Sequence, residues 1–126
     1  MSNQKYEFEE RLLRFSLTII FIVQNLNNDR FMSQVANQII KSTDLLSLHY
    51  RKAKELESLK EYIHEMNKVR GELKQVLIGL KIIQKNSDSI AESRIINASI
   101  ESRELASIFM KKIEIKKRDH KASLFI

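Results

Sequence analysis

Residues 8–26 read FEERLLRFSLTIIFIVQNL, and the spacing of apolar side chains in this stretch decides the fold class. Apolar residues recur at alternating steps of four and three, which places them on one face of an α-helix. That face contains Phe8, Leu12, Phe15, Ile19, Ile22 and Leu26. A second apolar set on another side of the helix contains Leu13, Leu17, Ile20 and Phe21. Because a short chain cannot bury both sides of one helix in its own core, we expect the second set to contact another subunit.

The same helical spacing continues along the rest of the chain. We predict helices at about 8–26, 31–54, 58–84 and 91–118, with frayed tails at 1–5 and 119–126. The breaks at 25–29 and 85–89 are rich in Asn, Asp and Ser, which favour turns and helix caps. Ser58 and Glu61 form a capping box at the start of the third helix. The sequence therefore predicts one domain over 1–126, an all-α, antiparallel, up-down-up-down four-helix bundle.

Three positions inside the predicted helices carry more specific expectations. Gly71 and Gly79 each cost a helix about 1 kcal/mol relative to alanine, so we expect a neighbouring helix to approach closely at both. The poor helix formers at 42–44 leave open a bend in the second helix. In the last helix the residues expected to point inward are Ile96, Ile100, Leu105, Ile108, Phe109 and Ile113.

The composition agrees with helices and excludes several other classes. The 126 residues include no proline, no cysteine and two glycines. A β-sandwich or barrel needs turn residues at about every ten positions, and this chain lacks them. The absence of cysteine excludes disulfides and cysteine-ligated metals and is typical of a reducing compartment, so we expect a cytoplasmic protein. The apolar run at 17–23 is far shorter than the ~20 residues of a membrane span, so we expect no membrane association.

The net charge of +6 is unevenly distributed. Residues 111–126 hold six cations and two anions, so four of the six net charges lie in this segment. Two basic clusters are candidates for contacts with nucleic-acid phosphates. They consist of Arg51, Lys52 and Lys54, beside Tyr50, and of Lys111, Lys112, Lys116, Lys117, Arg118 and Lys121. The alternative is that these cations only keep the bundle soluble, and no motif indicates reading of a specific base sequence.

The sequence offers no enzyme chemistry. Glu61 and His64 form a single Glu-x-x-His pair, whereas di-metal bundles use two. The serines lack the glycine-rich elbow of a nucleophile, and Glu101 and Glu104 are expected on a solvated helix exterior. We therefore predict a non-enzymatic scaffold or adaptor without metal or cofactor, binding RNA or DNA non-specifically. The alternative function is a protein–protein interaction module that docks a partner helix on an apolar face.

Three stretches together resemble a known family. They are FEERLLRF at 8–15, QIIKS at 38–42 and SLKEYIHEM at 58–66. Their order and spacing are similar to the bacterial four-helix-bundle family that includes proteins encoded in 23S rRNA intervening sequences. Accessory variability proteins of diversity-generating retroelements are more distant relatives.

The resemblance implies a four-helix bundle that assembles as a ring-like homopentamer without enzymatic activity. The retroelement relatives bind a reverse transcriptase and nucleic acid, which implies RNA, DNA or a protein as partner. Two departures affect the expected subunit interface. Residues 45–52 are bulkier and more basic than the small-residue run of the family, and Gly79 replaces a frequent tryptophan.

Overall fold

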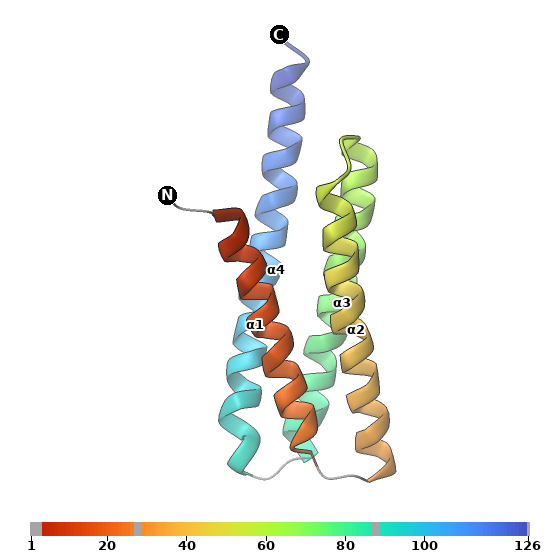
Figure 1. Cartoon of the computed structure of the whole chain (residues 1–126), viewed down its shortest axis with the longest axis vertical. Coiled ribbons are helices and arrows are strands. Elements are labelled where there is room, and N and C mark those ends of the chain that lie inside the picture. The colour runs from red at the N-terminus through yellow and green to blue at the C-terminus, as the bar shows by residue number, and fades with distance from the viewer. Residues whose placement is uncertain (1–3, 27–28, 87–88, 126) are drawn as a thin grey trace.

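The computed structural model describes residues 4–26, 29–86 and 89–125, and within them the chain forms four helices (Figure 1). The helices are α1 (Gln4–Gln24), α2 (Arg30–Lys54), α3 (Leu59–Asn86) and α4 (Ser89–Ser123). Successive helices run in opposite directions, and each packs against its neighbours in the bundle. The prediction of an all-α, up-down-up-down four-helix bundle is confirmed.

Short polar side chains set the starts of α2 and α3. The carboxylate Oδ1 of Asp29 accepts a hydrogen bond from the backbone N–H of Met32 at 2.7 Å. The hydroxyl of Ser58 accepts one from the backbone N–H of Glu61 at 3.3 Å. Each bond satisfies an amide that has no partner inside the helix, which is why the chain turns into a helix at these residues. Residues 27–28 and 87–88 of the two predicted breaks lie outside the described residues.

The terminal helices are longer than the sequence analysis predicts. α1 begins at Gln4, and α4 continues to Ser123, so the predicted frayed tails at 1–5 and 119–126 are wrong for residues 4–5 and 119–123. No glycine or proline interrupts α4, and lysines in its final turns are favourable near the negative end of the helix dipole. α2 is likewise continuous through 42–44 without a break in its helix.

The core is built from one apolar stripe of each helix. The predicted core face of α1 is buried at Leu12, Phe15, Ile19 and Ile22. In α4 the prediction is partly wrong, because Ile96 and Ile100 are 38% and 47% exposed. The stripe that α4 buries instead contains Ile95, Ala98, Ser102, Leu105, Phe109 and Ile113.

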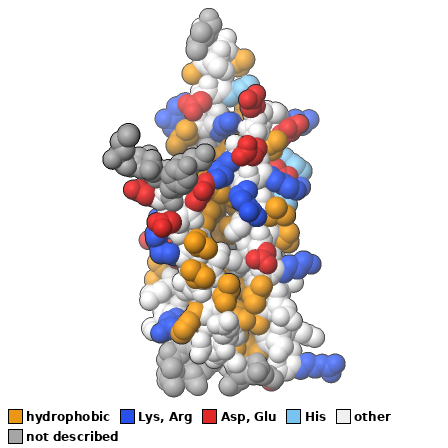
Figure 2. All heavy atoms as spheres, viewed as in Figure 1, with side chains coloured by type: hydrophobic (Ala, Val, Ile, Leu, Met, Phe, Trp, Pro, Cys, Tyr) orange, Lys and Arg blue, Asp and Glu red, His pale blue; other side chains and the backbone are white. Residues whose placement is uncertain are grey.

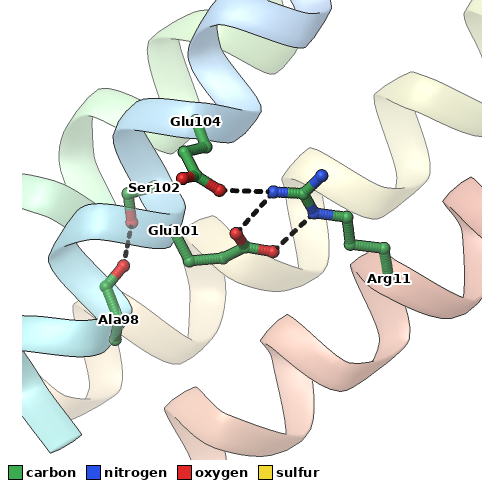
Figure 3. Close-up of polar contacts among 5 residues, drawn as sticks. All are labelled: Arg11, Ala98, Glu101, Ser102 and Glu104. Atoms are coloured by element: carbon green, nitrogen blue, oxygen red, sulfur yellow. Dashed lines mark hydrogen bonds and ion pairs between the residues drawn. The ribbon is translucent and has the colours of Figure 1, made fainter.

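The buried stripe of α4 differs from the predicted one in the size of two residues. It has Ala98 and Ser102 where the predicted stripe has the larger Ile96 and Ile100. Burial of Ser102 is possible because its hydroxyl donates to the carbonyl of Ala98 at 2.9 Å (Figure 3). The periodicity offered two apolar stripes one residue apart, and packing selected the one with the smaller side chains.

Among the described residues, the contact between α2 and α3 is more extensive than that of any other helix pair. A Cβ atom at Gly79 would lie 2.4 Å from Cγ1 of Ile39, so the two helices approach closely there. A Cβ atom at Gly71 would meet nothing within 4 Å. The expected close approach is therefore confirmed at Gly79 and wrong at Gly71.

A polar clamp joins α1 to α4 (Figure 3). The Nε and Nη2 atoms of Arg11 donate to the two carboxylate oxygens of Glu101 at 2.8 and 2.7 Å. Nη2 also donates to Glu104 at 2.7 Å. The hydrogen bonds that Arg11 donates to Glu101 raise the pKa of Arg11 and lower the pKa of Glu101. The expectation of a solvated helix exterior holds for Glu104, which is exposed, but is wrong for Glu101, which is only partly exposed and faces α1. A sequence alone does not show which helix faces such a side chain.

Replacing the two glycines by alanine tests the close helix approach. We expect Gly71→Ala to raise the free energy of unfolding by about 0.5–1 kcal/mol, because alanine favours the helix and the position is open. We expect Gly79→Ala to lower it by about 1–3 kcal/mol, because the added methyl overlaps the buried, β-branched Ile39. Urea unfolding followed by circular dichroism measures both. Equal stabilisation by the two substitutions would contradict the close approach.

The polar clamp gives a second prediction. Arg11→Met should lower the free energy of unfolding by about 1–2 kcal/mol at pH 7, because it breaks a bidentate, partly buried ion pair. Arg14→Met is the matched control in the same helix. The Arg14 guanidinium pairs with Glu10 at 3.7 Å and both side chains are exposed, so we expect a change below about 0.5 kcal/mol.

The effect of Arg11→Met should also depend on pH. A carboxyl whose pKa is lowered in the folded state stabilises the fold above its unfolded pKa, and this stabilisation is lost as the pH falls through the folded pKa. The Glu101 pKa lies below the ordinary 4.5, so the difference between wild type and Arg11→Met should shrink below about pH 4.5. Urea unfolding at pH 7 and pH 3 measures it. A difference that is constant with pH would contradict the role of the clamp.

Candidate functional site

Three aromatic rings form a triangle near the end of the bundle where α2 stops and α3 begins. Phe8 of α1, Tyr50 of α2 and Phe109 of α4 have ring centroids 5.5 to 5.7 Å apart. Tyr50 and Phe109 are buried. Tilted and edge-to-face ring pairs at this separation are favourable because ring edges and faces carry opposite partial charge. The triangle therefore fixes three helices relative to one another at this end.

Lysines from both basic clusters lie over these rings. The Nζ atoms of Lys54 and Lys112 are 5.5 and 5.8 Å from the centroid of the Tyr50 ring. Lys112 is also 4.4 Å from the centroid of Phe8. On the neighbouring helix α3, Tyr62 has the Nζ atom of Lys116 5.1 Å from its ring centroid. These distances are in the range of cation–π attraction. The two basic clusters, almost sixty residues apart in sequence, thus each place a lysine over the Tyr50 ring.

The electrostatics of the site reflect burial and like charge. Burial lowers the pKa of Lys112, and the neighbouring charge of Lys54 lowers it further. Lys54 forms an ion pair with Glu9 of α1. Burial raises the pKa of Tyr50 to about 12, with smaller contributions from Tyr62 and Glu9. Burial also raises the pKa of Tyr62. Both phenols are therefore neutral near pH 7 and keep their O–H groups.

Tyr50 separates two hollows in the surface. The first, which we call the tyrosine pocket, has a volume of about 240 Å³. It is lined by Tyr50, Tyr62, Lys112, Ile115, Lys116 and Asp119. The second, which we call the α1–α2 groove, has a volume of about 290 Å³. Its lining includes Glu9, Leu13, Ser16, Tyr50, Arg51 and Lys54.

The structure divides the nine predicted phosphate contacts into two groups. Four of them line the two hollows, namely Arg51, Lys54, Lys112 and Lys116, and we call these four the basic ridge. The other five are exposed and line neither hollow. They are Lys52, Lys111, Lys117, Arg118 and Lys121. Sequence spacing alone does not separate the groups, because the distinction depends on which helix packs beside each cation.

Two residues of this site escaped the sequence analysis. They are Tyr62, which lines the tyrosine pocket, and Glu9, which pairs with Lys54. A signal for Tyr62 exists in the sequence. Tyrosine at a core position brings a hydroxyl that must reach a polar partner or water, so Tyr50 and Tyr62 indicate places where the core meets a polar site.

The four predicted subunit-contact residues of α1 form an exposed stripe, which we call the α1 stripe. Leu13 and Leu17 are 57% and 55% exposed, and Ile20 and Phe21 are exposed as well. Figure 2 shows hydrophobic side chains gathered over the middle and lower part of this face of the bundle. The guanidinium of Arg94 lies 4.0 Å from the ring centroid of Phe21. The bundle thus leaves uncovered the second apolar side of α1.

Outside this site, a hydrogen bond between two polar side chains joins α2 to α3. The Nδ1 atom of His49 is 2.8 Å from Oε2 of Glu65, and this hydrogen bond is the main cause of the lowered pKa of Glu65. It connects α2 with α3.

A hollow of about 660 Å³ lies on the surface of α3, beside Lys60 and His64. No three His, Asp or Glu side chains in the described ranges are placed to hold a metal ion.

Comparisons of the chain with protein-family models, with curated proteins and with solved structures find no match. The resemblance to the family of 23S rRNA intervening-sequence proteins therefore stays a prediction. Among the helices of the described residues, none has an apolar stretch of the length that a bilayer crossing requires.

Proposed function

We propose that the protein is a non-enzymatic, cytoplasmic adaptor that binds RNA or DNA through the phosphate backbone, without sequence preference. The convergence of Lys54 and Lys112 on the Tyr50 ring carries this proposal. The Lys54 ammonium pairs with Glu9, but, in addition to burial, it still lowers the pKa of Lys112, so the two positive charges repel each other. A polyanion that lies across both ammonium groups reduces this repulsion. Phosphate contacts of this kind give affinity without reading the bases.

Assembly would strengthen this weak binding. The net charge of one chain is +6, of which residues 111–126 hold four and the rest of the chain only two. One copy therefore attracts a polyanion only weakly. Several copies with their basic ridges on one rim would attract nucleic acid much more strongly. We therefore propose a homo-oligomer, and the family resemblance favours a pentamer. A protein partner of the oligomer is part of the same proposal.

The exposed α1 stripe favours self-association as a second, independent function. Leu13 and Leu17 present large aliphatic side chains to solvent, and covering them by another copy would remove apolar area from water. The charged neighbours Glu10 and Arg14 on α1 compensate each other, so two stripes meet without net repulsion. The alternative is that a helix of a partner protein docks on the same stripe. The oligomeric state of the protein distinguishes these two possibilities.

The basic ridge can be tested against an equal loss of charge elsewhere. We compare wild type with a variant in which Arg51, Lys54, Lys112 and Lys116 are replaced by Gln. The control replaces the exposed residues Lys41, Lys74, Lys81 and Lys85 by Gln, which gives the same net charge. Gel-shift titration of single-stranded RNA at ~50 mM salt should give a wild-type Kd of about 10⁻⁶ to 10⁻⁴ M.

We expect the ridge variant to bind at least about tenfold more weakly than the control variant, with a smaller slope of log K against log salt. Each lost contact with a single-stranded phosphate reduces that slope by about 0.7. Absence of wild-type binding at high protein concentration would refute the proposed function. Equal weakening by the two variants would show that net charge alone, and not the ridge, attracts RNA.

The oligomeric state tests the α1 stripe. Light scattering of the wild type should give a mass several times the 14.8 kDa of one chain. Leu13→Gln combined with Leu17→Gln should give the monomer. Assembly would then bury two polar amide side chains without hydrogen-bond partners, which costs free energy. Ile78→Gln, at an exposed isoleucine of α3, is the control that should leave the mass unchanged. A monomeric wild type would contradict self-association and favour docking of a partner helix.

A further inference from the structure

The tyrosine pocket combines features that a general electrostatic surface does not need. Its lining comes from the ends of α2 and α3 and from α4, and it places two ammonium groups beside two phenol rings. Its volume of about 240 Å³ is sufficient for one small oxyanion. We infer that this pocket is a binding site for a single phosphate group, held by Lys112, Lys116 and the hydroxyls of Tyr50 and Tyr62.

The two phenol hydroxyls are the first part of the argument. Tyr50 and Tyr62 are only 6% and 8% exposed, and neither hydroxyl is hydrogen-bonded to another group of the described residues. Within the same part of the chain, Ser99 is the residue whose side-chain oxygen is both fully enclosed and without a partner. The phenol oxygens are therefore not sealed in the core. Both tyrosines line the tyrosine pocket, and Tyr50 also lines the α1–α2 groove.

The protonation of these phenols suits an anion. Burial raises both pKa values, that of Tyr50 to about 12, so each hydroxyl remains a donor at neutral pH. A donor that is fixed by a buried ring loses little freedom on binding, and hydrogen bonds to a charged acceptor are stronger than neutral ones. The tyrosines therefore supply two oriented donors in addition to charge.

The lysines supply that charge. Among the described residues, neither Lys112 nor Lys116 forms an ion pair with a carboxylate; their ammonium groups lie over aromatic faces instead. Lys54 lies next to Lys112 as well, but its positive charge is partly compensated by its ion pair with Glu9. Asp119 is the carboxylate that lines the pocket, and because it is exposed its repulsion is reduced by water and salt. A phosphate in the pocket would relieve the repulsion between Lys54 and Lys112.

The inference deepens the proposed function and partly rests on it, because the phosphate can belong to a nucleic-acid backbone. Free phosphate or a phosphomonoester has the same chemistry and is the other source. The pocket predicts that one phosphate along a bound strand is held in a fixed place, while the remaining contacts are only electrostatic. The two sources are separated by comparing inorganic phosphate with RNA.

Titration of the ¹⁵N-labelled protein with inorganic phosphate, at ionic strength held constant with chloride, tests the pocket. We expect saturable shifts of backbone amides around Tyr50, Tyr62 and Lys112, with a Kd in the millimolar range. Tyr50→Phe combined with Tyr62→Phe should weaken binding at least about tenfold, because it removes both hydroxyl donors and keeps the rings. Asp119→Asn, a surface change that leaves the core intact, should strengthen it. Lys41→Gln on the exposed side of α2 is the charge control and should leave the Kd within about twofold.

The outcomes separate this inference from the proposed function. Absence of saturable shifts in the wild type, or a Tyr→Phe double variant that binds phosphate as the wild type does, would overturn the inference. Phosphate binding without any binding of RNA would leave the pocket established and refute the nucleic-acid function. If the double variant loses RNA affinity as well as phosphate affinity, the phosphate comes from the backbone. If it loses only phosphate affinity, the ligand is a free phosphate group.

Discussion

The triangle of Phe8, Tyr50 and Phe109 is the interaction on which both the fold and the candidate site depend. It joins α1, α2 and α4 at one end of the bundle, with ring centroids less than 6 Å apart. The ring faces attract cations, so the same triangle also holds the ammonium groups of Lys54 and Lys112. A change that loosens the packing of these rings therefore also disperses the charges. The packing of this end of the bundle and the candidate site therefore share the same side chains.

The second constraint is that α1 is apolar on two sides while the bundle buries one. The stripe with Phe15 and Ile19 enters the core, whereas the stripe with Leu13 and Leu17 stays exposed. Leu13 also lines the α1–α2 groove together with Arg51. An assembly that covers the α1 stripe would consequently lie beside the basic ridge. Self-association and nucleic-acid binding are therefore proposed for neighbouring parts of the surface, which meet at the α1–α2 groove.

Much of the fold could be predicted because it depends on local rules. The helix starts after Asp29 and Ser58 follow from side chains that cap free amides, and this chemistry is readable within four residues of sequence. Residue-level packing was less predictable. Gly71 and Gly79 look alike in the sequence, yet only the second faces a buried side chain of another helix. In α4 the periodicity allowed two stripes, and the one with Ile96 remained outside.

By itself the sequence determined the number of helices, the starts of α2 and α3, the core face of α1 and the existence of two basic clusters. These properties depend on the order of residues along one helix, where spacing fixes the face. The tertiary structure alone decided that Lys54 and Lys112 share the Tyr50 ring, that Tyr62 joins them, and that Arg11 clamps Glu101. The physical reason is that such contacts depend on how helices rotate and slide against one another. Rotation and offset are set by the fit of side chains across all four helices, which no single segment contains.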